Sequence, residues 1–188
     1  MDNRSKILLC ALELFSDKGY DAVGIQEIVD KSEISKPTMY HYFGNKQGLL
    51  DALLKEYFDR LFCKLKDVIV YKGDLPLTLY RIVMTYFNFS KENPQFYRMQ
   101  LSMIFSPKKS LIAESVTTMN TYQYKIIEDL FISASQDHGN MKGRHCIYAS
   151  TFLGMINTYI GLFLDDSLEL NEECIYKAVH QFMHGIYS

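Results

Sequence analysis

The sequence has few residues that interrupt helices and few that could cross-link a fold. Its 188 residues include 4 Pro, 10 Gly, 4 Cys and no Trp. So few helix breakers leave room for long helices throughout. The cysteines, Cys10, Cys63, Cys146 and Cys174, are widely scattered and form no CxxC pair. This spacing argues against a disulfide or zinc framework and is typical of reduced, buried thiols in a cytosolic protein.

Long apolar runs and an excess of positive charge are also missing. No segment approaches the roughly 18 consecutive apolar residues of a membrane span. The first residues, MDNRSK, show no signal-peptide pattern. We therefore expect a cytoplasmic protein with no membrane partner. The net charge is -2, and the first fifty residues carry six basic against seven acidic side chains. If the chain binds DNA, it must do so with a few well-placed cations.

The motifs of enzymes are absent as well. The sequence contains no Gly-rich phosphate loop, no nucleophile elbow and no HExxH. His180 and His184 are spaced i, i+4, which can suit a metal, but no third ligand is tied to them by sequence. We expect no enzymatic activity, no cofactor and no metal.

Apolar residues recur instead at helical spacing over almost the whole chain. No alternation of period two is long enough for a sheet, so the predicted fold class is all-α with about nine helices. Their expected ranges are 4–18, 25–31, 36–42, 47–70, 74–92, 94–105, 107–135, 143–164 and 171–186.

The first three helices have the layout of a tri-helical helix-turn-helix, with two short helices joined by about three residues. Ser35 is a good N-cap, and Pro37 fits the first turn that follows. Gly24 stands at the N-cap of the preceding helix. We expect a helix-turn-helix domain over residues 1–48 and a larger helical domain over 49–188.

The segment from Gly19 to Leu50 reads GY-x4-I-x2-I-x5-ISKPTMYHYFGNKQGLL. It resembles the tetracycline-repressor (TetR) family of bacterial regulators over about the first quarter of the chain. The resemblance implies a homodimer, usually a repressor, that binds a palindromic DNA operator. It also implies that a small molecule entering the second domain weakens DNA binding.

The resemblance assigns roles in DNA binding to residues at matching positions. Ser35, Lys36 and Thr38 would begin the recognition helix and face the groove, Tyr40, His41 and Tyr42 would contact backbone or bases, and Lys46 would contact phosphate, with Phe43 in the core. Two positions depart from the family pattern. Gly24 replaces a Ser or Thr that often touches phosphate, leaving backbone N–H groups to do so. Glu33 occupies a turn position that is often Gly.

The second domain has a candidate dimer surface and a candidate effector pocket. The last two helices carry wide apolar surfaces, and Gly154 and Gly161 would let a partner helix approach. The predicted dimer residues are Phe152, Met155, Ile156, Tyr159, Phe163, Ile175, Val179, Phe182 and Met183. A surplus of Tyr, Phe and Met suits a cavity for a small hydrophobic or aromatic effector. The predicted lining residues are Tyr86, Phe89, Met99, Met103, Tyr122, Phe131 and Tyr159.

A second interpretation remains open. The chain could be a helical ligand carrier or interaction module whose helix-turn-helix no longer reads DNA. Gly24, Glu33 and the acidic balance of the first domain favour that alternative.

Overall fold

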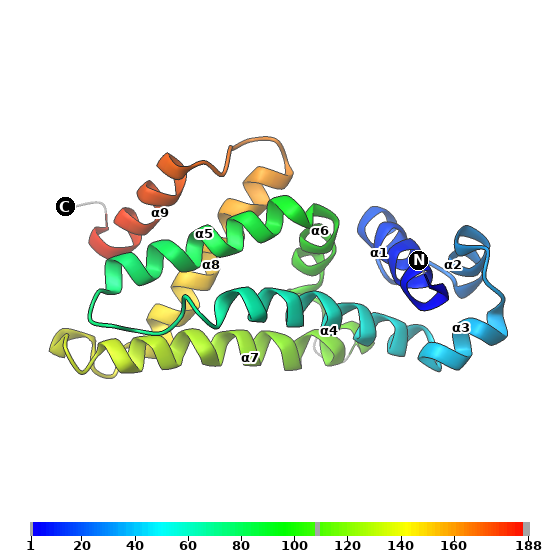
Figure 1. The fold of residues 1–188 in the computed structure, drawn as a ribbon, viewed down its shortest axis with the longest axis horizontal. Coiled ribbons are helices and arrows are strands. Elements are labelled where there is room, and N and C mark those ends of the chain that lie inside the picture. Colours follow the sequence, from blue (N-terminus) through cyan, green and yellow to red (C-terminus); the bar gives the residue numbers. More distant parts are fainter. Residues whose placement is uncertain (1, 108–109, 186–188) are drawn as a thin grey trace. The chain divides into compact units, whose positions relative to one another are not determined.

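The computed structural model describes residues 2–107 and 110–185, and over these ranges the fold is all-α (Figure 1). The described chain contains nine α-helices, one short 3-10 helix and no strand. The helices are α1 (Asn3–Lys18), α2 (Ile25–Ser32), α3 (Lys36–Phe43), α4 (Lys46–Leu65), α5 (Leu75–Glu92), α6 (Pro94–Met103), α7 (Leu111–Ala134), α8 (His145–Leu164) and α9 (Glu172–His184). The predicted fold class and number of helices are confirmed.

Two helix boundaries differ from prediction by more than two residues. Helix α4 ends at Leu65 and not near residue 70, where the β-branched run Val68-Ile69-Val70 lowers helix propensity. Helix α7 begins at Leu111 because the Ser110 hydroxyl accepts a hydrogen bond from the Ala113 N–H and so caps it. Its predicted start at 107 runs into residues 108–109, which lie outside the described residues, as does Ile186 at the predicted end of the last helix.

The helices form two compact units. The first comprises residues 1–59 and 93–119, and the second comprises 60–92 and 120–188. Helix α6 and the start of α7 therefore group with the three N-terminal helices. A domain boundary after residue 48 stays a prediction about which part folds independently.

In the first unit, α1 packs against α2, α3 and α6. Its core side chains are almost fully buried, among them Ile7, Phe15, Ile28, Met39 and Leu50. Each of the three N-terminal helices contributes to this core, so the short helices α2 and α3 are held by packing and not by their own propensity.

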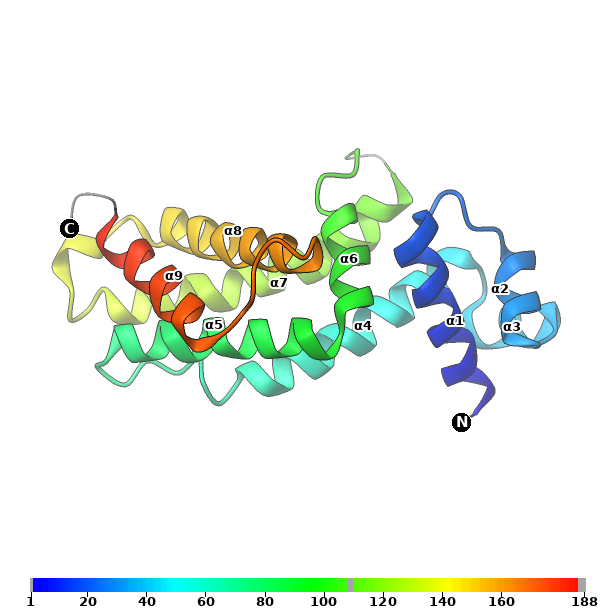
Figure 2. The ribbon, with the colours of Figure 1, turned by 90° about the horizontal axis from the view of Figure 1, so that it is seen from above.

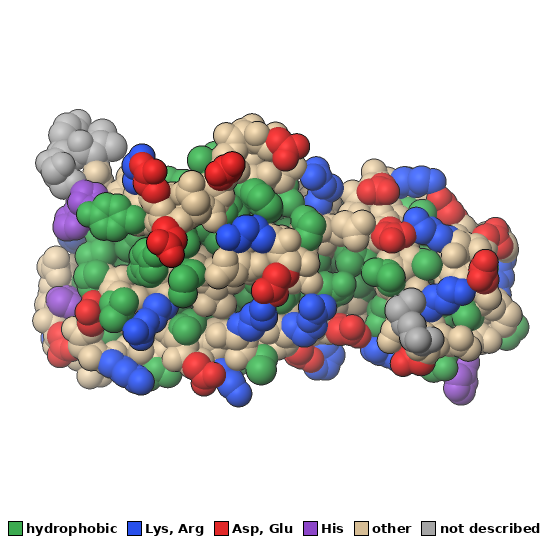
Figure 3. Space-filling view, turned by 45° about the horizontal axis from the view of Figure 1, so that its top comes forward, with side chains coloured by type: hydrophobic (Ala, Val, Ile, Leu, Met, Phe, Trp, Pro, Cys, Tyr) green, Lys and Arg blue, Asp and Glu red, His purple; other side chains and the backbone are tan. Residues whose placement is uncertain are grey.

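In the second unit, α5 packs against both α8 and α9, which also contact each other (Figures 1 and 2). Ile82, Tyr86 and Phe87 from α5 are fully buried with Phe152 and Ile156 from α8. Hydrophobic side chains lie among charged ones over α5 and α9 on the face seen in Figure 3.

Helix α8 is unusual in composition. It has no Asp, Glu, Lys or Arg, and by length and composition it could cross a membrane. One such helix is weak evidence for a membrane segment. Only 22% of its most apolar window is buried within the chain, so it presents unpartnered apolar surface.

The thiols are less buried than the sequence predicts. Cys174 is buried and Cys10 partly so, but Cys63 and Cys146 are exposed, and all four are free. The expectation of buried thiols is wrong for Cys63 in α4 and for Cys146 at the start of α8, whose side chains face solvent.

Candidate nucleic-acid interface

The recognition helix α3 begins as the sequence predicts. The Ser35 side chain accepts a hydrogen bond from the Thr38 N–H at 3.3 Å, which caps the helix. The Ser35 and Thr38 hydroxyl oxygens are also 2.8 Å apart and hydrogen bonded. These two hydroxyls are therefore already oriented by each other at the exposed start of the helix.

The inner and outer faces of α3 are clearly separated. Met39 and Phe43 are buried, whereas Tyr40 and Tyr42 are 45% and 43% exposed. His41 between them is exposed and its ring lies 5.7 Å from that of Tyr42. Both tyrosines therefore point away from the core. The three adjacent rings can offer two phenols and an imidazole to a ligand.

Most cations of the helix-turn-helix already have partners. Ion pairs join Arg4 to Glu56, Lys6 to Glu33, Lys18 to Glu27 and Lys31 to Glu13. Among the basic residues between positions 2 and 48, all of which the structure describes, Lys36 alone has neither an ion pair nor a hydrogen bond from its ammonium. The exposed Lys36 stands at the first turn of α3.

Lys46 is engaged within the first unit. Its ammonium donates to the backbone carbonyl of Tyr20 and lies 4.1 Å from the centroid of the Tyr20 ring. Burial lowers the pKa of Lys46 from its ordinary value. The phosphate contact predicted for Lys46 stays a prediction, and it would require the ammonium to leave this position.

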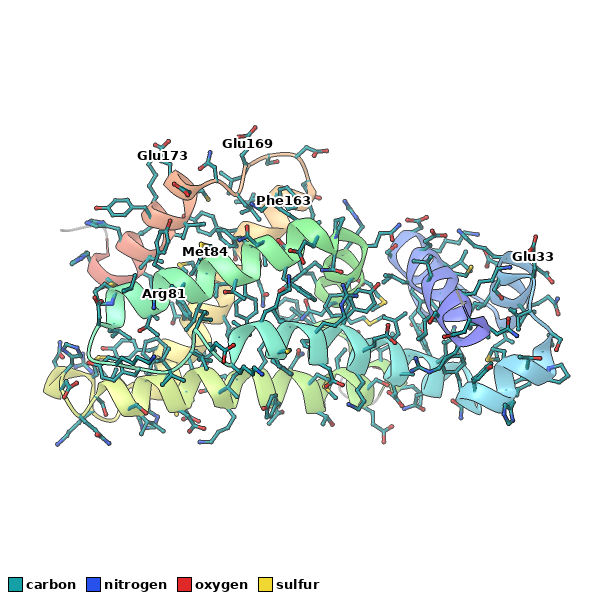
Figure 4. All side chains as sticks on the ribbon, in the orientation of Figure 1. Glu33, Arg81, Met84, Phe163, Glu169 and Glu173 are labelled. Atoms are coloured by element: carbon teal, nitrogen blue, oxygen red, sulfur yellow. The ribbon has the colours of Figure 1, made fainter. Side chains whose placement is uncertain are left out.

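The turn before α3 shows why the family often has Gly at the position of Glu33. Glu33 is the C-cap of α2 and adopts a left-handed conformation with φ of 55°, which glycine accepts at least cost. Its side chain projects from the unit (Figure 4) and pairs with Lys6. The carboxylate therefore neutralises a lysine beside the recognition helix.

The N-terminus of α2 is capped by Gly24, which has an extended backbone and makes no side-chain cap hydrogen bond. The first N–H groups of α2 are left for water or an anion. A Cβ at Gly24 would meet nothing within 4 Å, so the missing hydroxyl is not a consequence of crowding.

The connection from α3 to α4 is tightly constrained. Asn45 accepts a hydrogen bond from the Gly48 N–H at 2.7 Å. A Cβ at Gly48 would lie 2.1 Å from the Phe43 carbonyl oxygen, far inside van der Waals contact. Glycine at position 48 thus sets the angle at which α4 leaves the recognition helix.

In the second unit, the predicted dimer residues divide into two groups. Phe152, Ile156, Ile175 and Val179 are buried within the unit, so their assignment to a dimer surface is corrected to the core. Met155, Tyr159, Phe163, Phe182 and Met183 keep exposed surface.

The outward face of α8 includes residues that were not among the predicted dimer residues. Ile147 is 66% and Leu162 43% exposed. A groove of about 450 Å³ between α8 and α9 is lined by Ile147, Tyr148, Thr151, Met155, Thr158, Tyr159, Gln181 and Phe182. Because α8 is apolar on all sides, periodicity could not reveal which side faces the core.

The predicted pocket residues do not form one cavity. Met99 and Met103 belong to the first unit. Tyr86 and Phe89 belong to the second unit and are fully buried in its core. Tyr122, also in the second unit, is 53% exposed. Tyr159 lines the groove between α8 and α9. Of this set, Phe131 alone lines the cavity of about 280 Å³ in the second unit. The other residues of that cavity are Leu75, Pro76, Leu79, His138, Asn140, Met141, Tyr148, Phe182 and Met183.

Residues 7–53, which include all of α2 and α3, match the family model described as "Bacterial regulatory proteins, tetR family". This segment carries the N-terminal domain of the TetR family. The expected resemblance is confirmed, and the family is one of regulatory proteins and not of enzymes.

Two relatives of known sequence extend the match beyond that domain. YuxN of Bacillus subtilis, named an uncharacterized HTH-type transcriptional regulator, is 38% identical over 104 residues, which is 54% of this chain and 35% of YuxN. FasR of Mycolicibacterium smegmatis, named a transcriptional activator, is 33% identical over 98 residues, or 52% of this chain and 45% of FasR. The chain thus spans less than half the length of these two relatives.

The fold of the whole chain is also that of solved structures. The regulator FadR of Bacillus subtilis, solved in complex with stearoyl-CoA, matches with a TM-score of 0.82. The match covers 97% of this chain and 99% of that one at 17% identity. At that identity the likeness establishes a TetR-type fold and nothing about the ligand.

Proposed function

We propose that this protein is a TetR-family transcriptional repressor that binds a palindromic DNA operator as a homodimer in the cytoplasm. We further propose that a small hydrophobic or aromatic effector releases it. The observation that carries the proposal is Lys36, a lysine without a partner at the exposed start of a capped recognition helix.

The exposed side chains of α3 suit the major groove. Lys36 can donate to the acceptors of guanine, and the Thr38 methyl or hydroxyl can contact a base edge. Tyr40, His41 and Tyr42 carry donors that reach phosphate or base edges from one exposed surface. The Ser35 cap and the open N-terminus of α2 at Gly24 add backbone donors for phosphate.

The charge balance of the first domain determines the non-specific affinity for DNA and its dependence on salt. With most cations held in internal ion pairs, the domain has little charge left for phosphates. The salt dependence of a dimer is about -0.9 per neutralised phosphate. We therefore expect modest non-specific affinity, with specificity coming from the side chains of α3.

A dimer is needed to present two recognition helices about 34–36 Å apart in successive major grooves. The uncharged outer face of α8, with Ile147, Met155 and Leu162, supplies apolar surface for a second copy. The groove between α8 and α9 would receive side chains from the partner.

The effector site best supported by the geometry is the cavity lined by Phe131 and Tyr148. At about 280 Å³ it lies at the small end of ligand sites. Its lining is mainly apolar, and His138 and Asn140 add polar groups that can orient a ligand. A small aromatic molecule with one hydrogen-bonding group fits this chemistry.

Selection of bound fragments from a genomic DNA library tests the DNA function. The full chain at low salt and without effector should enrich a palindrome, and a Lys36→Ala protein should enrich it less. Lys31→Ala is the matched control, because Lys31 is held by Glu13. Failure to enrich any palindrome would overturn the proposal. A reporter gene under that palindrome then separates repression from activation.

The helical carrier remains the alternative. It is favoured by the internal ion pairs, above all Lys6 with Glu33 beside the turn. A carrier would bind apolar ligands in a thermal-shift screen but would enrich no DNA sequence, whereas a repressor would do both.

A further inference from the structure

Three metal-ligating side chains meet where α7 and α8 lie together in the second unit. Glu128 comes from α7, and His145 and Cys146 are the first two residues of α8. One Glu128 carboxylate oxygen, Oε1, lies 3.0 Å from His145 Nδ1 and 2.9 Å from Cys146 Sγ. The Cys146 Sγ and His145 Nδ1 atoms are 3.7 Å apart. From these atoms we propose a binding site for a borderline-soft divalent metal ion of the Zn²⁺ class.

The separations are close to those of a tetrahedral centre. Typical zinc bond lengths place neighbouring ligand atoms about 3.3–3.6 Å apart. The sulfur and the imidazole nitrogen, 3.7 Å apart, are within about 0.1 Å of that spacing. The carboxylate oxygen would move outward by about half an ångström, because it is now held by hydrogen bonds that the metal replaces.

The ligand set selects the class of metal. Thiolate and imidazole favour Zn²⁺, Co²⁺ or Cu²⁺ over the hard cations Mg²⁺ and Ca²⁺, which prefer all-oxygen sites. On binding, the Cys146 thiol proton leaves to solvent and an S–metal bond takes its place. His145 supplies the lone pair of Nδ1, and water completes the fourth position.

The surroundings hold this arrangement in place. The Tyr124 hydroxyl donates to the Cys146 carbonyl at 2.9 Å, which fixes the first turn of α8. The other carboxylate oxygen of Glu128 lies 3.5 Å from the Lys125 ammonium. That ammonium is closer to Asp129, at 2.9 Å, so its charge is partly balanced and Oε1 stays available.

The three side chains can be reached from solvent, and no other such cluster occurs in the described residues; both facts support the same assignment. The Glu128 and His145 side chains are 13% and 31% exposed, and Cys146 is exposed, so an ion can enter from solvent. Across residues 2–107 and 110–185, no other three His, Cys, Asp or Glu side chains gather their ligand atoms in this way. The pair His180 and His184 has no third ligand in that part of the chain.

The site was not foreseen from the sequence, which led us to expect no metal. Glu128 stands 17 residues before His145, a spacing that no common motif encodes. The adjacent His145-Cys146 pair was the signal that could have pointed to it. A bound ion would tie α7 to the first turn of α8, the helix whose outer face we propose for dimerisation.

Cobalt titration of the reduced, metal-free full chain tests the proposal. Co²⁺ should bind at one equivalent per chain and produce a thiolate-to-cobalt charge-transfer band, which Zn²⁺ then abolishes by displacement. Cys146→Ser should remove the band, and Glu128→Gln should weaken binding by roughly 10-fold or more. Far-ultraviolet circular dichroism checks that each variant is folded.

Two matched variants make the result decisive. Cys63→Ser removes the other exposed thiol, and a His180→Ala/His184→Ala double variant removes the other candidate ligands; both should keep the band and the stoichiometry. Near a hundredfold excess of Zn²⁺ over its Kd, the wild-type melting temperature should rise by about 5–10 °C, and that of Cys146→Ser should not. No charge-transfer band, or a band retained in Cys146→Ser, would overturn the site. Neither outcome depends on DNA binding.

Discussion

The Lys46 ammonium sits over the Tyr20 ring, 4.1 Å from its centroid, and donates to the carbonyl of the same residue. A lysine at the start of α4 thus fastens the connection between α1 and α2. In a helix-turn-helix, this contact helps to hold the recognition helix on its support. This contact gives Lys46 a structural role, and the phosphate contact implied by the family resemblance stays a prediction.

Replacing Lys46 by Met separates these two roles. Methionine keeps much of the packing but loses the cation–π contact and the hydrogen bond to the carbonyl. We expect the free energy of unfolding in urea to fall by about 1–2 kcal/mol. The slope of log affinity against log salt should stay unchanged. A slope reduced by about 0.9 per chain would instead assign Lys46 to phosphate.

Lys36→Ala should weaken operator binding by about 1–3 kcal/mol and relax the preference at one base position of each half-site. The reason is that Lys36 is free to reach a base edge. Binding titrations at fixed salt against a panel of single-base variants measure both effects. Lys31→Ala should leave the base preferences intact, and wild-type affinity in Lys36→Ala would rule out the groove contact.

Gly24→Ser should restore a side-chain cap to α2. Space for the new Cβ is open, and the hydroxyl can accept from an unpaired N–H of the first turn. The expected gain in unfolding free energy is about 0.3 kcal/mol. Operator affinity should rise without a change in salt slope, because a neutral hydroxyl releases no counterion. Gly24→Ala is the control, since alanine caps less well than glycine and should lower stability.

Gly48→Ala should be strongly destabilising, by about 2 kcal/mol or more, because the methyl group meets the Phe43 carbonyl. The connection must shift to relieve that contact, so operator affinity should fall as well. Gly139→Ala, where a Cβ meets nothing within 4 Å, should be nearly neutral. Thermal melting of both variants shows whether backbone crowding is the cause.

Tyr86→Phe should show how much a buried hydrogen bond contributes to the free energy of unfolding. Gln123 Nε2 donates to the Tyr86 hydroxyl at 2.8 Å inside the second unit. Removing the hydroxyl leaves that N–H group buried and unpaired, so we expect a loss of about 1–3 kcal/mol at neutral pH. A Tyr86→Phe/Gln123→Met double variant should recover much of it, which urea unfolding measures.

The same substitution predicts a change at alkaline pH. Burial raises the pKa of Tyr86 far above its ordinary value of 10.0. The native state keeps the phenol proton, whereas the unfolded chain releases it above pH 10. The contribution of Tyr86 to the free energy of unfolding is therefore fully present below pH 10 and decreases above it. In Tyr86→Phe, the free energy of unfolding should decrease less steeply above pH 10, by about 1.4 kcal/mol per pH unit. Tyr176→Phe, an exposed control, should not alter the slope.

Most of the helices could be predicted from local features of the sequence. The Ser35 cap and the apolar spacing of Met39 and Phe43 were readable because each depends on neighbours within one or two turns. The nine predicted helices followed from such signals, and their largest boundary errors are at the end of α4 and at the start of α7, which the Ser110 cap sets.

The sites were harder to predict, for a physical reason. Which side of α8 is buried is decided by α5 and α9, so Phe152 and Ile156 were misplaced on the surface and Ile147 was missed. The ion pair between Lys6 and Glu33 joins residues 27 positions apart, and nothing in either neighbourhood reveals it. Contacts made between elements need the fold before they can be seen.

The absence of charge on α8 has a consequence for how the protein would respond to its surroundings. Association through an uncharged face depends on apolar burial, which salt scarcely weakens, whereas each phosphate that a DNA-bound dimer neutralises makes its affinity for DNA fall as salt rises. Rising ionic strength would therefore strip a dimer from its operator while leaving the two copies joined. Assembly and DNA occupancy would thus be set by separate physical variables.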